Sequence, residues 1–399
     1  MGLTRSGVGP KSGRQRAQGG RVVSMSDLNG GAASHVDHVG SLVRPPELME
    51  CWRAHEAGEK SAEALRAVQD AAIRDAVKLQ EDCGLGVVSD GEFRRGGWSR
   101  GFMEATGAFG FKPSKLVFRN EDGVETAAPA PVTTRKIARR SPIVVGDFEF
   151  LRSVTTATPK VTMPTPSHMH FGHFGEAADR SIYPDMAEWW EDLIAVYQEE
   201  VEALAAVGCT LLQIDEVPLT LCCDETNRAV ARENGADPDA LIELYIDMIN
   251  RAVGGRPPEM RVLMHLCRGN MQGLWMGDGG YGPIAEKLFD RAQVDGFLME
   301  YDSPRAGDFA PLQYLPKGKR VYLGIMSTKN PEVEAGDMLK RRIEEACRYA
   351  DLDQLGLCPQ CGFGSSAMSK FNVLDNPMTL DIEKQKLTRL AEVAEEIWG

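Results

Sequence analysis

The chain has 399 residues, of which 43% are hydrophobic and 26% are charged, as is usual for a globular protein. Its formal net charge of −13 argues against nucleic acid or an anionic membrane surface as the main partner. No apolar run approaches the ~18 residues of a membrane-spanning helix. The nine cysteines, in a chain without a secretory signal, predict a cytoplasmic protein with free or metal-bound thiols.

The N-terminal segment is rich in glycine, arginine and serine and has no apolar core of a signal peptide. We expect residues 1–33 to be a disordered leader, within which Met25 is an alternative start. No internal repeat or long linker divides the remainder, so residues 34–399 are expected to form one domain.

Eight short β-prone runs follow in chain order, separated by longer helical stretches. The runs are "HVDHVGSLVR" (35–44), "LGVVSDGEF" (85–93), "PKVTMPTP" (159–166), "CTLLQIDEVP" (209–218), "RVLMHLCRG" (261–269), "VDGFLMEYDSP" (294–304), "KRVYLGIMS" (319–327) and "LDQLGLCPQCGF" (352–363). The clearest helices are expected at 46–82, 184–207 and 337–350. Eight alternating units predict an α/β fold with parallel strands, the closed (β/α)8 TIM barrel.

One segment interrupts this alternation. Residues 108–150 contain β-prone pieces around the turn-forming "NEDG", so we expect an inserted β-hairpin after the second strand.

Polar or reactive residues come at the ends of most of the eight runs. Barrel enzymes carry their chemistry at the carboxyl ends of the strands, so these residues are expected to share one site. They are Ser41 and Arg44, Asp90 and Glu92, Asp215 and Glu216, His265 and Cys267, Glu300 and Asp302, and Cys358 and Cys361.

Four of these side chains could hold a metal. His265 and Cys267 stand two apart on an expected strand, so their side chains point the same way. Glu300 is a carboxylate among apolar residues, where a charge partner or metal is expected. Cys361 precedes Gly362, which lets the backbone pass close to a bound group. One imidazole, one carboxylate and thiolates suit Zn²⁺. The alternatives are packed thiols or, for the CxxC pair, a redox function.

Six motifs, in this order, resemble the catalytic barrel of cobalamin-independent methionine synthase, and more closely its short single-barrel relatives. The motifs are "HVGSLVRP", "SDGEFRR", "LLQIDEVP", "HLCRGN", "LMEYD" and "CPQCGF". The resemblance runs from about Val36 to the C-terminus. In that family zinc is bound by the His and Cys of an HxC motif, a Glu and the Cys before a Gly. The resemblance therefore implies as catalytic zinc ligands His265, Cys267, Glu300 and Cys361.

The resemblance also implies the reaction. A zinc-bound thiolate of homocysteine would take a methyl group from a 5-methyltetrahydrofolate-type donor, as in methionine biosynthesis. Cys358 is not a ligand in the family pattern and is expected to be a packed thiol. The family's substrate-binding positions fall on Gly40, Ser41, Glu92 and Asp215.

Three departures from the family pattern concern the folate donor. Val217 follows the DE motif where a proline is usual, and "PLTLCCDE" has no Glu to match the one that engages the pterin. Met326 occupies the place of a proton-delivering His, and only the expected leader precedes the first strand, where the full-length enzyme has a second barrel. These departures leave open another donor and thiol, as in an epoxyalkane:coenzyme M transferase.

A coenzyme M site would need a cationic pocket for a sulfonate. Candidates for it are Arg44, Arg94, Arg95 and Arg268. A zinc-stabilised binding module is the non-enzymatic alternative. The expected partners are a small-molecule thiol and a methyl or alkyl donor, and a homo-oligomer is left open.

Five further side chains are weaker candidates. Any one of three histidines after the third strand could act as an acid or a substrate contact, with a structural function as the alternative. Two aromatic side chains could line a donor pocket, with ordinary packing as the alternative. These residues are His168, His170 and His173, and Trp98 and Phe102.

Overall fold

The computed structural model describes residues 32–365 and 375–399. Residues 1–31 of the expected leader, including Met25, lie outside the described residues. The leader boundary at residue 33 was placed too late, because the 3-10 helix η2 (Ala32–His35) already belongs to the fold. The Arg320 guanidinium donates to the Ser34 carbonyl (2.6 Å), which holds this turn against the barrel.

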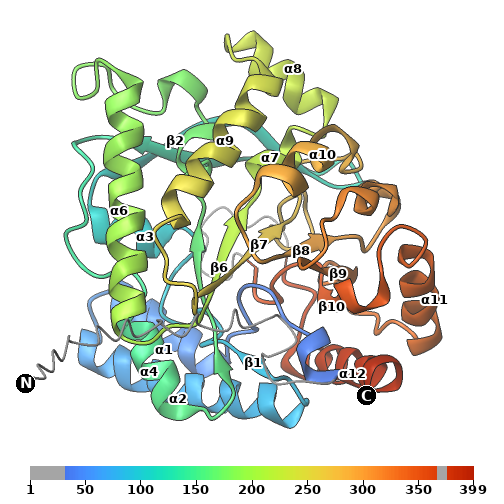
Figure 1. Ribbon diagram of the computed structural model, residues 1–399. Coiled ribbons are helices and arrows are strands. Elements are labelled where there is room, and N and C mark those ends of the chain that lie inside the picture. The colour runs from blue at the N-terminus through green and yellow to red at the C-terminus, as the bar shows by residue number, and fades with distance from the viewer. Residues whose placement is uncertain (1–31, 366–374) are drawn as a thin grey trace, which may run out of the picture.

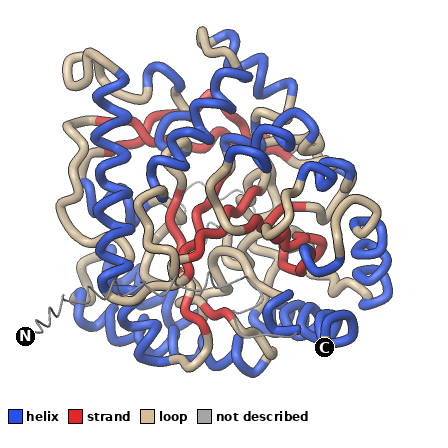
Figure 2. Tube along the Cα trace, in the orientation of Figure 1, coloured by secondary structure: helices blue, strands red, loops and turns tan. Residues whose placement is uncertain are grey.

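Parallel strands form a ring at the centre of the molecule, and helices surround it (Figures 1 and 2). Six strands pair in parallel in the order β10-β9-β8-β7-β6-β5. A second parallel pair is β1 with β4. The strands are β1 (Val87–Val88), β4 (Thr158–Pro159), β5 (Val161–Pro164), β6 (Leu211–Glu216), β7 (Arg261–Leu266), β8 (Gly296–Glu300), β9 (Arg320–Met326) and β10 (Leu355–Pro359).

The first expected run completes the ring with few backbone bonds. Val36 forms a parallel bridge to Leu357 of β10, and the Leu42 N–H donates to the Gly91 carbonyl beyond β1 (3.2 Å). Because β4 and β5 lie one residue apart in the third run, all eight expected runs are accounted for. The predicted (β/α)8 TIM barrel is confirmed.

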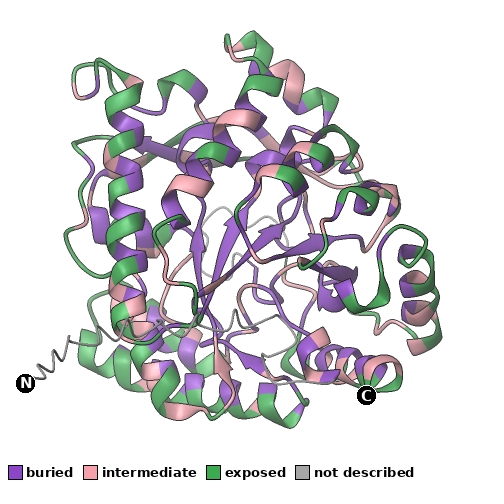
Figure 3. Ribbon diagram, viewed as in Figure 1, coloured by how far each residue is buried: buried purple, intermediate pink, exposed green. Residues whose placement is uncertain are grey.

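The helices cover the outside of the ring, with their exposed faces toward solvent (Figure 3). They are α1 (Pro46–Glu56), α2 (Ala62–Asp82), α3 (Arg100–Thr106), α4 (Val145–Val154), α5 (His168–Phe171), α6 (Met186–Ala206), α7 (Pro218–Leu221), α8 (Glu225–Glu233), α9 (Pro238–Val253), α10 (Gly282–Arg291), α11 (Gly336–Ala346) and α12 (Leu380–Trp398). Within the described residues, none of these helices is both long and apolar enough to cross a membrane.

The helix expected at 46–82 is two helices, α1 and α2. Gly58 adopts a φ of 77°, a left-handed conformation that ends the first helix at little cost. Ser61 then caps the second, because its hydroxyl accepts a hydrogen bond from the Ala64 N–H (3.2 Å). Helix-favouring residues such as glutamate, arginine, alanine and leucine on both sides concealed this break.

The inserted hairpin is present as β2 (Phe109–Arg119) and β3 (Glu125–Thr133), which pair antiparallel. The Asn120 side chain accepts from the Val124 N–H (3.0 Å) and so closes the expected turn. The predicted insert of 108–150 was too long at its end, where α4 already begins. The buried Glu200 carboxylate accepts from the Val144 N–H (2.7 Å) and fixes the start of α4, a distant partner that local sequence does not reveal.

A layer of side chains fills the interior of the barrel. Six are apolar residues and the seventh is the Cys358 thiol, and all lie apart from the core between strands and helices: Val39, Val87, Leu211, Leu263, Leu298, Tyr322 and Cys358. The third run contributes the buried Lys160, whose ammonium donates to the Asp37 carboxylate (2.6 Å) and the His38 carbonyl (2.6 Å). All nine cysteines are free thiols.

The first and last runs approach each other closely at the carboxyl end of the barrel. A Cβ on Gly362 would lie 2.6 Å from the Ser41 nitrogen and 2.9 Å from the Ser41 oxygen. The glycine after Cys361 is therefore needed because the backbone of Ser41 passes against it. This contact fixes the Cys361 loop on the Gly40–Ser41 segment.

We predict that Gly362→Ala lowers the free energy of unfolding by about 1–3 kcal/mol, because the added methyl group meets backbone atoms that cannot turn aside. Denaturant unfolding followed by circular dichroism measures the change. The control is Gly146→Ala in α4, where a Cβ would meet nothing within 4 Å. Equal stabilities for the two variants would contradict the packing argument.

Candidate functional site

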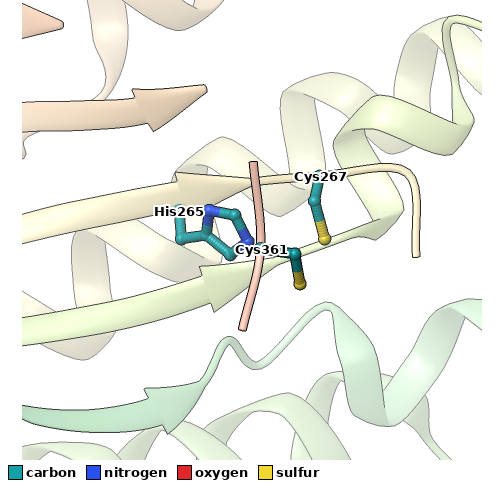
Figure 4. A group of neighbouring side chains, drawn as sticks. All are labelled: His265, Cys267 and Cys361. Atoms are coloured by element: carbon teal, nitrogen blue, oxygen red, sulfur yellow. The ribbon is translucent and has the colours of Figure 1, made fainter. Parts of the chain in front are cut away.

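Three potential ligand atoms converge at the carboxyl end of the barrel. His265 is the penultimate residue of β7, Cys267 follows that strand directly, and Cys361 lies two residues beyond β10. A ring nitrogen of His265 and the two sulfur atoms all lie within 4.8 Å of one another. Figure 4 shows the two sulfurs side by side, with the imidazole next to them. His265 and Cys267 are buried, and Cys361 is half-buried.

The orientation of the His265 ring fits a metal ligand. Its Nδ1 lies 3.1 Å from the Leu298 carbonyl, which requires Nδ1–H to donate and leaves a lone pair on Nε2. Nε2 is buried and has no hydrogen-bond partner among the described residues. An orphaned imidazole nitrogen beside two thiols is the mixed N/S donor set that zinc prefers. The residues present therefore fit a zinc ion.

The two thiols have opposite acidities. Contact with Cys267, helped by His265 and Lys329, holds the pKa of the Cys361 thiol well below its ordinary value despite burial. The same contact and burial raise the pKa of Cys267. Cys361 is therefore the more acidic of the two thiols and Cys267 the less acidic, whereas a coordinated zinc would hold both as thiolates.

Glu300, the fourth predicted ligand, ends β8 beside this group but is not part of it. Within the described residues the cluster of atoms inside 4.8 Å consists of His265, Cys267 and Cys361. The Glu300 side chain is fully buried and ion-paired with Arg305 (3.0 Å) and Lys329 (3.4 Å). Burial alone would raise its pKa, but the surrounding cations lower it to about 2. Glu300 is therefore an ionised carboxylate held between two cations.

The predicted substrate-binding residues also lie at this end of the barrel. The Glu92 carboxylate is ion-paired with Arg95 and accepts from the Thr162 hydroxyl (2.9 Å). A Cβ on Gly40 would lie 4.0 Å from Glu92 Oε1, so the Gly40–Ser41 turn faces that carboxylate.

Asp215 lies next to both the Glu92–Arg95 ion pair and the group of His265, Cys267 and Cys361. It is the register partner of His265 across β6 and β7, and its carboxylate lies 4.0 Å from the Arg95 guanidinium. Burial raises the pKa of Asp215 to about 6, against the effect of His265. Glu92 and Asp215 thus converge on Arg95, next to the His/Cys/Cys group.

The four arginines considered for a sulfonate pocket already have partners. Arg44 donates to the Glu92 carbonyl (2.9 Å), and the fully buried Arg268 donates to the Gly279 carbonyl (2.6 Å). Arg94 pairs with Asp70 (2.7 Å), and Arg95 with Glu92. Arg94 and Arg95 nevertheless border a pocket beside the site, so a cationic pocket for a sulfonate stays a prediction.

The three histidines occupy three different environments. His170 Nδ1 lies 2.9 Å from the Tyr245 hydroxyl within an aromatic cluster, and His173 Nε2 lies 3.2 Å from the Ala130 carbonyl of the hairpin. These contacts indicate structural functions for both. His168 packs against Trp98 with 3.9 Å between ring centroids, and burial lowers its pKa to about 3, so it is neutral at pH 7.

The two aromatic candidates line one pocket. Trp98 and Phe102 border a pocket of about 280 Å³ between α3, the segment before α4 and the end of β5. Arg95 and Thr162, which bind Glu92, also border it. The pocket therefore adjoins the carboxylates of Glu92 and Asp215.

Some residues at the site were not predicted from the sequence. Arg305 and Lys329 neutralise Glu300, and Asn270 donates to the Thr328 hydroxyl (3.1 Å) and toward the Gly362 carbonyl (3.4 Å). The available signal was their position in the chain. Arg305 and Asn270 follow strands that carry predicted ligands, and Lys329 follows a strand next to one of these. Their partners depend on how separate loops meet in space.

Comparisons with known proteins agree with this geometry. Protein YxjH of Bacillus subtilis (strain 168), described as uncharacterized, is 37% identical over 92% of this chain and 95% of its own. A methionine synthase of Pyrococcus abyssi is 26% identical over 81% of this chain and 84% of its own. A solved structure from Listeria monocytogenes, a candidate vitamin-B12-independent methionine synthase, has a TM-score of 0.69 and 29% identity, covering 92% of this chain and 98% of its own.

A family match also covers most of the chain. Residues 36–373 match the family described as "Cobalamin-independent synthase, Catalytic domain". That range contains the converging His265, Cys267 and Cys361, the carboxylates of Glu92 and Asp215, and the glycines that bring the first and last runs together. The chain therefore belongs to the family of cobalamin-independent synthase catalytic domains.

Proposed function

We propose that this protein is a zinc-dependent S-methyltransferase that methylates the thiol of homocysteine. The observation that carries the proposal is the convergence of His265, Cys267 and Cys361 within 4.8 Å at the carboxyl ends of the strands. A zinc ion held by these residues, with Glu300 as the candidate fourth ligand, would keep the substrate thiol deprotonated and nucleophilic at neutral pH.

The remaining residues bind and orient the acceptor. We assign the ammonium group of homocysteine to Glu92 and Asp215, since buried carboxylates form strong charge-assisted hydrogen bonds. The Gly40–Ser41 turn faces Glu92 and would position the amino-acid end. Burial of Asp215 and His265 excludes water and strengthens these interactions.

We place the methyl donor in the pocket lined by Trp98 and Phe102. Its aromatic walls suit a planar or cationic methyl carrier, and 5-methyltetrahydrofolate is the first candidate because the relatives with named activities are methionine synthases. Met326 is fully buried in β9 and cannot donate a proton to a departing nitrogen. A different group would have to serve as that acid.

Turnover tests the proposal directly. Zinc-loaded protein given homocysteine and 5-methyltetrahydrofolate should form methionine, detected by mass spectrometry. X-ray absorption should show an added sulfur ligand on zinc, with roughly one proton released per site. An unchanged zinc shell would overturn the proposal. Turnover of an epoxide with coenzyme M, and none with homocysteine, would assign a thiol alkyltransferase instead.

The two cysteines of "CPQC" should differ sharply in their contribution to zinc binding. We predict that Cys361→Ser abolishes tight zinc binding, because a hydroxyl replaces a soft thiolate donor. The control, Cys358→Ser, should retain roughly one zinc per chain, because Cys358 lies in the barrel interior. Zinc content after dialysis against a weak chelator measures both. Loss of metal from the Cys358 variant alone would show that the ligand assignment is wrong.

Asp215→Asn should weaken homocysteine binding about tenfold, or ~1.4 kcal/mol, because the amide cannot neutralise the substrate ammonium. Isothermal titration of zinc-loaded protein measures the loss. The matched ligand is 4-mercaptobutyrate, which has the thiol, the carboxylate and the chain length of homocysteine but no ammonium group, and its affinity should be unchanged. An equal loss of affinity for both thiols would show that Asp215 does not bind the ammonium group.

A further inference from the structure

Glu300 has a complete set of partners of its own, apart from the three converging ligand atoms. Its Oε2 accepts from the Arg268 backbone N–H (2.8 Å). Its Oε1 accepts from the Arg305 guanidinium (3.0 Å) and lies 3.4 Å from the Lys329 ammonium. A fully buried carboxylate needs such partners, and here protein groups alone provide them.

The two cations are themselves fixed in place. The Arg305 guanidinium stacks over the Trp275 ring at 4.4 Å and lies 3.6 Å from the Asp302 carboxylate. The Lys329 side chain is 8% exposed, so its ammonium is nearly as buried as the carboxylate it faces. Both residues therefore occupy their positions as part of the fold and not as mobile surface charges.

The loop that carries Lys329 is tied to the same carboxylate network. The Ser327 hydroxyl donates to Asp302 (2.7 Å), and the Lys329 N–H donates to the Ser327 hydroxyl (3.2 Å). Lys329 is thus positioned by the ends of β8 and β9 together. Removal of its side chain would leave the backbone contacts of this loop in place.

We propose that Arg305 and Lys329 compete with zinc for the Glu300 carboxylate and so set the metal affinity of the site. In the arrangement held by these cations, His265, Cys267 and Cys361 bind the metal, and Glu300 stays paired outside the group. The inference rests on the proposed zinc centre and concerns the two cations as positioning residues. It provides a way to keep a coordination position available to the substrate thiol.

The test is the affinity for zinc ion alone, measured by competition with a chromophoric chelator. Lys329→Met should bind zinc about tenfold more tightly, because Glu300 is then freer to join the metal. Lys329→Arg keeps the cation and should stay near the wild-type value. Lys340→Met removes a partly exposed lysine of α11 that is ion-paired with Glu396 (2.8 Å) and should leave the zinc affinity unchanged.

A double-mutant cycle separates competition from simple charge repulsion. In a Glu300→Gln background, where no carboxylate is left to compete for, Lys329→Met should no longer tighten zinc binding. An equal gain in both backgrounds would show that Lys329 only repels the metal. Weaker zinc binding by Lys329→Met would show that the lysine supports the site, and either result overturns the inference.

The same titration distinguishes this inference from the proposed function. If no variant binds zinc, the metal centre itself fails, and the inference fails with it. If zinc binds tightly to the wild-type protein and Lys329→Met leaves the affinity unchanged, the metal centre stands and only the competition is excluded. Neither result depends on turnover or on the identity of the methyl donor.

Discussion

The charges at the carboxyl end of this barrel lie out of water, and a buried charge has to be matched by a partner at close range. Glu300 is matched by two cations, Glu92 by Arg95, and the buried Glu216 by hydroxyl groups and the Leu219 N–H (2.6 Å). His265 Nε2, in contrast, has no hydrogen-bond partner among the described residues and lies beside two thiols, a donor set that suits a soft cation. The architecture of the site follows from this constraint.

The sequence predicted the barrel and the convergence of His265, Cys267 and Cys361, because both depend on regular geometry. Parallel strands end at one side of a barrel, and residues two apart on a strand share a face, so His265 and Cys267 had to point together. The position of Glu300 at the next strand end also followed from this rule. Its ion pairs did not, because Arg305 and Lys329 reach it from two loops whose meeting is set by tertiary packing.

Other features of the structure could not be predicted because they too depend on tertiary contacts. The cluster "PSHMHFGH" looks uniform in sequence, yet its histidines contact Trp98, Tyr245 and the hairpin backbone, which lie in distant parts of the chain. The early start of α4 depends on Glu200, and the break between α1 and α2 on one left-handed glycine. Local patterns show which residues are reactive or apolar, whereas their partners are decided by long-range contacts.

The contact between the first and last runs has a consequence for the order of folding. Arg44 donates to the Gly364 carbonyl across 320 residues of chain (3.3 Å), and Gly362 packs on Ser41 beside it. Contacts of such long range form late, because much of the chain must be ordered before they stabilise it. During synthesis, Cys361 emerges after nearly all of the barrel. A nascent chain therefore cannot assemble the group of His265, Cys267 and Cys361 early, and the proposed zinc ion would enter a ring that has already closed.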